Sequence, residues 1–231
     1  MSSHLETKIT ASEAFSSFFN GWLCRQQVFL DQLEDKNNNQ QLIQLLLNHY
    51  SEYYDEKARV IWEDPFLLFS PPWLTSFEKS FLWVAGFKPS LAFRLLELSV
   101  FDLELEQLER LTVLKADVAR EERTHLESLA AVQETTGAPP LLNLAKHYGR
   151  LVDGEVSKFP KAVQGLCLSM SRVVQGADNL RRNTTIKLLD ILNVNQSLNF
   201  LAYVAKFQLG IRTLGLGIDS KMMSQDIGLG H

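Results

Sequence analysis

The chain has 231 residues, of which 27 are acidic, 23 are basic and 45% are apolar, so its composition is that of a folded globular protein and excludes a fibrous or disordered one. A formal net charge of −4 argues against the broad basic face that binding to several DNA phosphates requires. Two cysteines without metal-ligand spacing, Cys24 and Cys167, fit a reducing compartment, and we expect both to be small core residues.

The N-terminal residues contain no apolar stretch typical of a secretory signal, and we expect residues 1–12 to be disordered. The capping box Thr10-Ala-Ser-Glu13 predicts that the first helix starts there, and Asn37 to Asn39 mark a loop after it. Aromatic and apolar residues recur at three- and four-residue steps along one face of this helix: Phe15, Phe18, Phe19, Trp22, Phe29, Leu30 and Leu33.

A second helix is predicted from Gln41 to near Pro65, packed antiparallel to the first, because apolar and aromatic residues again recur at helical spacing. Ser70-Pro71-Pro72-Trp73 cannot be helical. A second capping box, Thr75-Ser-Phe-Glu78, then predicts a short helix that carries Phe81, Leu82 and Trp83, ends at Gly86 and is followed by a helix starting near Pro89.

The longest helix is predicted near 103–135, where proline and glycine are absent. Its apolar seam is interrupted by Glu121, Glu122 and His125, which occupy positions that would otherwise face a partner helix. Residues 137–140, Gly-Ala-Pro-Pro, predict a hinge.

The rest of the chain predicts shorter helices over Leu141–Leu151, Pro160–Val174, Ala177–Leu192 and Asn195–Leu214, with Asn195 as the cap of the last one. Residues 215–231, rich in glycine, predict a flexible tail. The apolar window 198–211 falls short of the ~20 residues of a membrane span. No segment has the alternation of a strand, so we predict an all-α, multi-helix bundle that forms one domain over 13–214.

Glu122-x-x-His125 has the spacing of carboxylate-bridged metal centres in helical bundles. Such a centre needs two of these pairs and two further glutamates, whereas the chain offers only the reversed His49-x-x-Glu52, so we expect no metal. No phosphate loop or nucleophile motif is present, and therefore we expect no enzyme activity. His49, Tyr50, Tyr53 and Tyr54 have a spacing that favours core packing over a ligand pocket.

Six groups of residues stand in order along the chain: Phe15-x-x-Phe18-x-x-x-Trp22-Leu23-x-x-Gln26, His49-Tyr50-x-Glu52-Tyr53-Tyr54-x-x-Lys57, Ser70-Pro71-Pro72-Trp73-Leu74-Thr75 with Glu78, Phe81-Leu82-Trp83, Gly86-Phe87, and Arg120-Glu121-Glu122. In this order they resemble the plant Delay of Germination domain family, whose domain also occurs on the C-terminal side of TGA-type basic leucine-zipper transcription factors. Gln196–Leu214 is similar to the closing helix of that family, so the resemblance covers nearly all of the chain.

The resemblance implies a non-enzymatic, all-helical plant regulator of seed dormancy, germination and abscisic-acid signalling, located in the nucleus, the cytoplasm or both. It implies that the motif residues from His49 to Glu122 are structural, and that a type 2C protein phosphatase docks on the first helix around Ser17, Phe18, Phe19 and Trp22. The chain has Ser17 and Gly21 where the founding member is acidic. Haem occurs in the family through C-terminal histidines that are not matched here, so no cofactor is expected.

Two hypotheses of function follow from these patterns. The first is a regulatory adaptor that acts by protein–protein interaction through aromatic side chains exposed on the first helix. The second is a transcriptional co-regulator that associates with TGA-type factors, or with a second copy of the chain, along a seam marked by Glu121 and Glu122. Fewer than twenty residues precede Phe15, and they hold no basic region or leucine heptads, so we expect no direct contact with nucleic acid. A small-ligand pocket between the tyrosine-rich helix and the Pro-Pro-Trp turn is a third possibility.

Overall fold

A computed structural model describes residues 10–34, 40–139, 141–143 and 159–228. Within these residues the regular secondary structure is helical, and the only extended pairing is an isolated bridge between Trp83 and Gly86, which confirms the all-α prediction. The elements are α1 (Ala11–Glu34), α2 (Gln40–Glu63), η1 (Pro65–Phe69), α3 (Ser76–Lys79), α4 (Leu91–Ser99), α5 (Leu105–Glu134), η2 (Thr135–Gly137), α8 (Phe159–Ile191) and α9 (Val194–Gly228).

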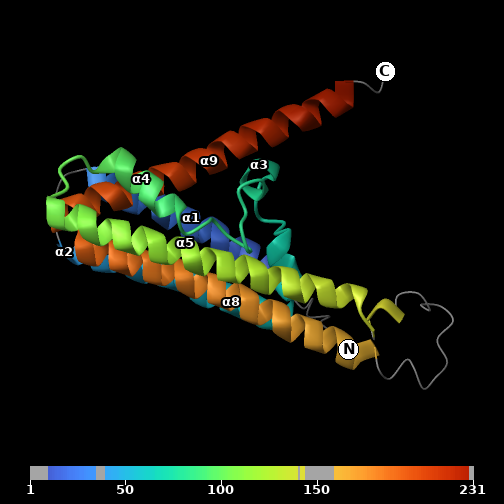
Figure 1. Cartoon of the computed structure of the whole chain (residues 1–231). Coiled ribbons are helices and arrows are strands. Elements are labelled where there is room, and N and C mark those ends of the chain that lie inside the picture. Colours follow the sequence, from blue (N-terminus) through green and yellow to red (C-terminus); the bar gives the residue numbers. More distant parts are fainter. Residues whose placement is uncertain (1–9, 35–39, 140, 144–158, 229–231) are drawn as a thin grey trace, which may run out of the picture.

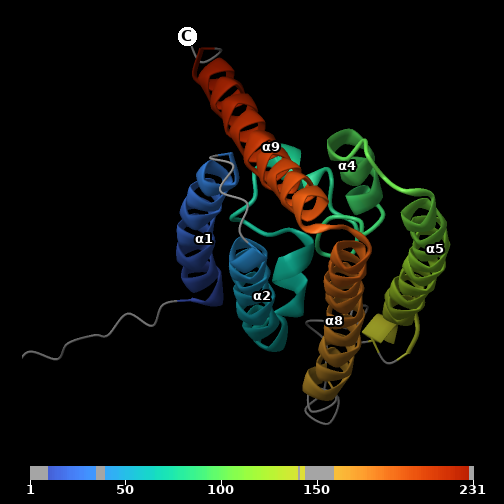
Figure 2. The same cartoon turned by 90° about the vertical axis from the view of Figure 1, so that its left-hand side faces the viewer.

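The long helices α1, α2, α8 and α5 lie side by side in that order and form a curved layer (Figures 1 and 2). The first half of α9, helix α4 and the segment between α2 and α4 cover one side of this layer. The end of α9, beyond its contacts with α3, extends away from the rest of the molecule (Figure 1). Among the described residues, no helix combines the length and apolar character needed to cross a membrane.

Helices α1 and α2 are antiparallel, as the sequence predicts. Phe29 and Trp22 both contact the His49 ring, and Phe15, further back along α1, contacts Tyr53, further on along α2. The predicted capping box starts α1: the amide of Thr10 donates to Glu13 Oε2 over 2.9 Å, and the amide of Glu13 donates to Thr10 Oγ1 over 3.2 Å. Because α1 begins at Ala11, the last two residues of the segment predicted to be disordered are helical.

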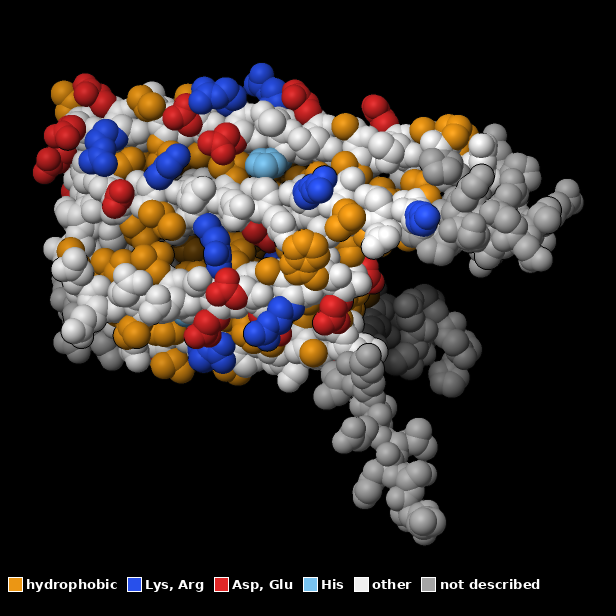
Figure 3. All heavy atoms as spheres, turned by 90° about the horizontal axis from the view of Figure 1, so that it is seen from below, with side chains coloured by type: hydrophobic (Ala, Val, Ile, Leu, Met, Phe, Trp, Pro, Cys, Tyr) orange, Lys and Arg blue, Asp and Glu red, His pale blue; other side chains and the backbone are white. Residues whose placement is uncertain are grey.

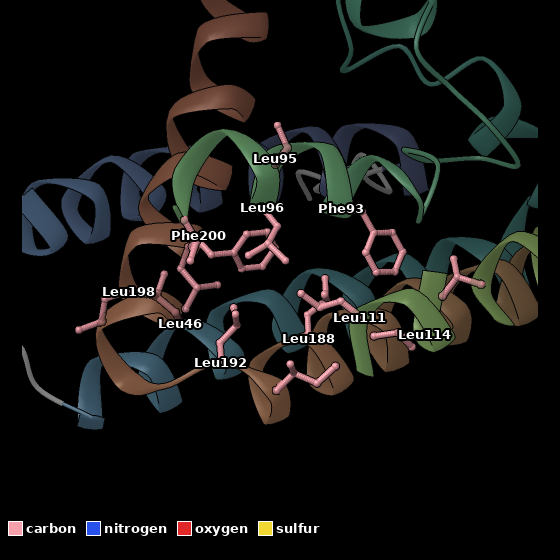
Figure 4. Close-up of a cluster of buried hydrophobic side chains, with 14 of the residues drawn as sticks. Leu46, Phe93, Leu95, Leu96, Leu111, Leu114, Leu188, Leu192, Leu198 and Phe200 are labelled. Carbon is pink, nitrogen blue, oxygen red and sulfur yellow. The ribbon is translucent and has the colours of Figure 1, made fainter. Parts of the chain in front are cut away.

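The core has two main parts. One joins α2, α4, α5, α8 and α9, where leucine and phenylalanine side chains from these helices meet (Figure 4). The other joins α1, α2 and the Pro-Pro-Trp segment, and its centre is Phe15, which is 1% exposed and lies 4.3 Å from the Trp73 ring. Cys24 is exposed, contrary to the prediction, because the buried face of α1 runs through Trp22 and Gln26 and leaves Cys24 on the other side.

Helix α8 is continuous where the sequence predicts two helices separated near Gly176. Gly176 belongs to the contact with α5, since a Cβ atom there would lie 2.6 Å from Cε1 of His125. The glycine therefore permits close packing of the two helices and does not end α8.

Helix α9 also differs from the prediction at both ends. Its cap is Asn193, not Asn195: the Asn193 side chain accepts from the Gln196 amide over 2.9 Å, and the Gln196 side chain accepts from the Asn193 amide over 3.0 Å. The helix continues to Gly228, through most of the segment predicted as a flexible tail. With 35 residues α9 is longer than α5 with 30, so the prediction that the longest helix lies near 103–135 is wrong. Gly215 lies against α3, where a Cβ atom would be 2.1 Å from Oγ1 of Thr75.

The short helix α3 ends at Lys79, so the predicted extension to Gly86 is wrong. Residues 83–86 instead form a tight turn in which Trp83 and Gly86 exchange backbone hydrogen bonds of 2.7 and 3.0 Å. Ala85 has a positive φ of 53°, a strained conformation for a residue with a side chain. Contacts from α2 and α8, described below, hold this turn.

Several predictions fall outside the described residues: disorder in residues 1–9, the loop at Asn37 to Asn39, most of the helix Leu141–Leu151, and the end of the tail at 229–231. The domain limits and the hinge at 137–140 stay predictions. Thr135–Gly137 forms the one-turn helix η2 at that point.

The contrasting surroundings of two glycines in α9 give a test of its packing. We expect Gly215→Ala to lower the free energy of unfolding by about 1–3 kcal/mol, because the new methyl group collides with Thr75. A Cβ atom on Gly217 would meet no other atom within 4 Å, so Gly217→Ala is expected to raise that free energy by about 0.5–1 kcal/mol. Urea denaturation of both variants measures the difference; equal effects would contradict the described path of α9.

Candidate functional site

Three charged side chains form a buried cluster at the centre of the molecule. Lys57 of α2 and Asp178 and Arg181 of α8 are each less than a tenth exposed. The Lys57 ammonium donates to Asp178 Oδ1 over 2.8 Å, and Arg181 donates to the same oxygen. Two cations thus share one carboxylate, and the cluster carries a net charge of +1 when all three groups are ionised.

The same two cations hold the turn at residues 83–87. Lys57 donates to the carbonyl of Ala85 over 2.7 Å, while Arg181 donates to the carbonyls of Val84 and Phe87 over 2.6 and 2.7 Å. A Cβ atom on Gly86 would lie 2.8 Å from Cζ of Arg181, so glycine is needed for this approach. These bonds compensate for the strained backbone of Ala85.

Burial lowers the pKa of Lys57 to about 8, although the neighbouring carboxylate of Asp178 acts in the opposite direction. Desolvation disfavours the charged ammonium more than a single shared carboxylate stabilises it. The positive charge of Arg181 also lowers the pKa of Lys57.

Tyr53 and Tyr54 of α2 lie near the charges of this cluster. Burial raises the pKa of their hydroxyls and of the Tyr50 hydroxyl, that of Tyr54 to about 12. Tyr50 accepts from Gln26 Nε2 over 2.6 Å and donates to Gln208 Oε1 over 3.2 Å. Gln26 also donates to Gln208 over 3.0 Å, so this network connects α1, α2 and α9. The tyrosine side chains are both core residues and walls of a cavity.

His49 is 2% exposed and stacks on Trp22 with ring centroids 4.5 Å apart. The Trp22 indole donates to the carbonyl of His49 over 2.9 Å. Both ring nitrogens of His49 are buried without a hydrogen-bond partner among the described residues. Burial, and secondarily the charge of Arg25, lowers the pKa of His49 to about 4, so the ring is neutral near pH 7.

A second polar contact joins the motif at 70–78 to α9. Glu78 closes the capping box with Thr75 and accepts from Arg212 Nη1 over 2.8 Å. Arg212 also donates to the carbonyl of Trp73 over 2.7 Å and lies over the ring of Phe19. Asp219 accepts from the amide of Ser76 over 3.2 Å. Within the motif, Pro71 is buried, whereas Ser70 and Pro72 are exposed.

A cavity of about 450 Å³ lies among α2, α4, α8, α9 and the segment between α2 and α4. Its walls contain the charged cluster, the three tyrosines and the buried Pro71 and Trp73. The cavity thus lies where the sequence places the third possibility, between the tyrosine-rich helix and the Pro-Pro-Trp turn. On the opposite face of the layer, Figure 3 shows a hollow with apolar walls.

The structure brings together only part of the predicted partner-binding set on α1. Ser17 is exposed and Phe18 is half-buried, but Phe19 and Trp22 are 6% and 3% exposed. The expectation of exposed aromatic side chains is therefore wrong for these two. They pack against Tyr53 of α2, with ring centroids 6.2 and 5.3 Å away.

Glu121 is exposed, but Glu122 is 3% exposed and makes contacts within the chain. It accepts from the amide of Ser90, the residue before α4, over 2.6 Å and from Lys88 over 3.2 Å. Glu122 is thus not available for an oligomer seam.

His125 lies edge-on to Trp83 at 6.3 Å, while Glu52 pairs with Arg25 on the surface. Among the described residues, no three His, Cys, Asp or Glu side chains are grouped as metal ligands. His147 lies outside that part of the chain.

Sequence reasoning missed Asp178, Arg181, Gln208 and Arg212. Asp178 and Arg181 are spaced at i, i+3 on an otherwise apolar helix face, which is a local sign of a buried pair. Their partners lie far away in the chain, Lys57 being 121 residues from Asp178, so the sequence alone does not reveal the cluster.

Comparisons with known proteins show the family to which the chain belongs. The sequence model of a family described as seed dormancy control (DOG1) matches residues 24–97. Protein ZW2 of Arabidopsis thaliana is 36% identical over 221 residues, which cover 90% of this chain and 98% of that protein. This chain belongs to the DOG1 family.

Two further relatives of this DOG1-family chain have informative names. The Arabidopsis protein RESPONSE TO ABA AND SALT 1 is 34% identical over 219 residues, covering 88% of this chain and 95% of that protein. Transcription factor TGA2.3 of rice is 24% identical over 173 residues, covering 75% of this chain and 53% of that factor. The family membership supports a regulatory role of the DOG1 type, and the TGA factors share part of the domain.

Removing the Asp178 carboxylate from the charged cluster should strongly lower the free energy of unfolding. We expect Asp178→Ala to lower the free energy of unfolding by about 3–5 kcal/mol, because Lys57 and Arg181 would remain buried without a carboxylate. The control Asp117→Ala removes the partner of Arg120 on the exposed side of α5 and is expected to cost less than about 1 kcal/mol. Chemical denaturation at pH 7 measures both; similar small losses would show that the cluster is solvated.

The buried ring of His49 should make the free energy of unfolding depend on pH. Its pKa in the folded chain, about 4, lies below its ordinary value of 6.5. Between these values the unfolded chain binds a proton that the folded chain does not, so stability falls as the pH falls from 6.5 to 4, by at most about 1.4 kcal/mol per pH unit. We expect His49→Gln to flatten this part of the stability curve, measured by urea denaturation. Parallel curves for variant and wild type would exclude His49 as the source.

Proposed function

We propose that this protein is a non-enzymatic adaptor of seed-dormancy and abscisic-acid type signalling, which acts in the nucleus, the cytoplasm or both by binding a signalling protein. Membership of the DOG1 family and the name of the relative RESPONSE TO ABA AND SALT 1 support the pathway. A type 2C protein phosphatase is the partner that we propose first. The observation that supports binding as the activity is a surface of exposed apolar side chains.

That surface is the corner where α4 passes into α5. Four large apolar side chains there are exposed, Phe101 by 87% and Leu105 by 74%, together with Leu98 and Leu108. We call these four residues the α4–α5 corner. Phe19 and Trp22 are buried, so the corner replaces them as the proposed docking surface, whereas Ser17 and Phe18 can contribute only from the outer side of α1.

The charges around the corner indicate what it binds. Asp102, Glu104, Glu106 and Glu109 are all exposed along the same stretch of chain. Acidic side chains gather at this end of the molecule, at the upper left of Figure 3. A partner segment with apolar side chains flanked by Lys or Arg is complementary to it.

An alternative is a co-regulator of transcription that associates with TGA-type factors. The observation that favours it is the similarity to about half of the rice factor TGA2.3. Since homologous domains often associate through equivalent surfaces, we propose that a TGA-type factor is the second candidate partner.

The experiment measures binding of the full chain to a type 2C phosphatase of abscisic-acid signalling and, separately, to a TGA-type factor. We expect the double variant Phe101→Glu, Leu105→Glu to weaken binding at least 10-fold, with an unchanged circular dichroism spectrum, because both residues are exposed. The matched control is Val113→Glu, which changes a 63% exposed residue of α5 outside the corner.

Binding of the phosphatase supports the adaptor, and binding of the TGA-type factor alone supports the co-regulator. Failure of the wild-type chain to bind either protein would contradict both proposals. Equal binding by the wild type and the double variant would overturn the placement at the α4–α5 corner.

A further inference from the structure

The central cavity has the size and composition of a ligand site. Its volume of about 450 Å³ lies within the range of ~300–1,000 Å³ typical of small-molecule pockets. Most of its wall is aliphatic or aromatic, from side chains that belong to both parts of the core: Leu68, Trp73, Phe200, Leu201, Val204 and Phe207. Such a wall fits an apolar molecule.

The charges on the wall do not balance. Glu78 pairs with Arg212, Arg182 with Asp55, and Lys88 with Glu122, so each of these lining residues is neutralised one to one. Lys57 and Arg181 share the single carboxylate of Asp178. One positive charge therefore remains, on side chains that are less than a tenth exposed.

Hydrogen-bond donors are also available at this point. Lys57 uses two of its three ammonium hydrogens, on Ala85 and Asp178, among the described residues. The hydroxyls of Tyr53 and Tyr54 donate no hydrogen bond to another residue of the described part, and both side chains line the cavity. A group with two acceptor oxygens and one negative charge matches this set of donors.

We propose that the cavity binds a small apolar molecule that carries one carboxylate, with Lys57 and Arg181 meeting the carboxylate and the aromatic walls enclosing the rest. The carboxylate supplies the negative charge that the ionised cluster lacks. The Asp178 bridge and the bonds to the turn at 83–87 hold both cations in place before the ligand arrives. The site is separate from the α4–α5 corner and does not depend on the proposed partner.

The ligand has a route from solvent. The lining residues Gln44 and Asn48 of α2 and Ile186 of α8 are exposed, so the cavity reaches the surface between these two helices. The hollow in Figure 3 lies on this face of the molecule. Arg182, which pairs with Asp55 and lies over the ring of Tyr54, is positioned beside this opening.

Isothermal titration calorimetry of the full chain tests the proposal with two pairs of probes, 1-naphthoate with 1-naphthamide and decanoate with decanol. Each pair differs mainly in the carboxylate, and the two pairs differ in shape. We expect at least one carboxylate to bind ten-fold or more tightly than its neutral counterpart. Failure of both carboxylates to bind, or equal affinity within each pair, would overturn the proposal.

Two variants test separately whether binding depends on the charge of Lys57 and on the free volume of the cavity. Lys57→Met leaves the Asp178–Arg181 pair balanced, so the chain is expected to fold, and the preference for the carboxylate should fall at least five-fold. Val204→Trp fills the cavity from α9 and should abolish binding of both members of a pair, whereas Val113→Trp, on the exposed side of α5, should change nothing. Thermal melts confirm folding. Full binding by Val204→Trp would place the ligand elsewhere and overturn the assignment.

Discussion

The shared carboxylate of Asp178 is the contact on which the centre of this protein depends. It lets Lys57 of α2 and Arg181 of α8 be buried together, and these two cations in turn hold the carbonyls of residues 84, 85 and 87. Without the anion, two positive charges would lie in a region of low dielectric constant, which is strongly unfavourable. The cluster therefore joins two helices of the layer to the segment that covers them.

This arrangement explains why the family motifs are spread along the chain. Lys57 comes from one motif, the turn at Gly86 from another, and Glu78 of a third contacts Arg212 on α9. In these three contacts the opposite side comes from α8 or α9. Lys57, Gly86 and Glu78 all line the same cavity. A wall with excess positive charge is also suited to bind an anion.

The sequence predicts the helices well where the signal is local. The capping boxes at Thr10 and Thr75 and the apolar spacing of α1, α2 and α5 all appear in the structure. Predictions fail where a distant contact decides the local structure: Gly176 and Gly215 look like helix breakers but permit close packing against His125 and Thr75. Likewise, the aromatic stripe of α1 cannot show by itself that Phe19 and Trp22 pack against α2, since exposed and buried stripes have the same spacing.

The sequence alone predicts only part of the candidate site. The tyrosines and the Pro-Pro-Trp turn indicate its walls, but the charges that define its chemistry come together over 121 residues of chain. The most direct test of this account is the titration of Lys57, followed by NMR of the chain with ¹⁵N-labelled lysine side chains and assigned with Lys57→Met. The account predicts that the Lys57 ammonium group titrates near pH 8, because Lys57 is buried beside a shared carboxylate. Titration of Lys57 near its ordinary pKa of 10.5 would contradict it.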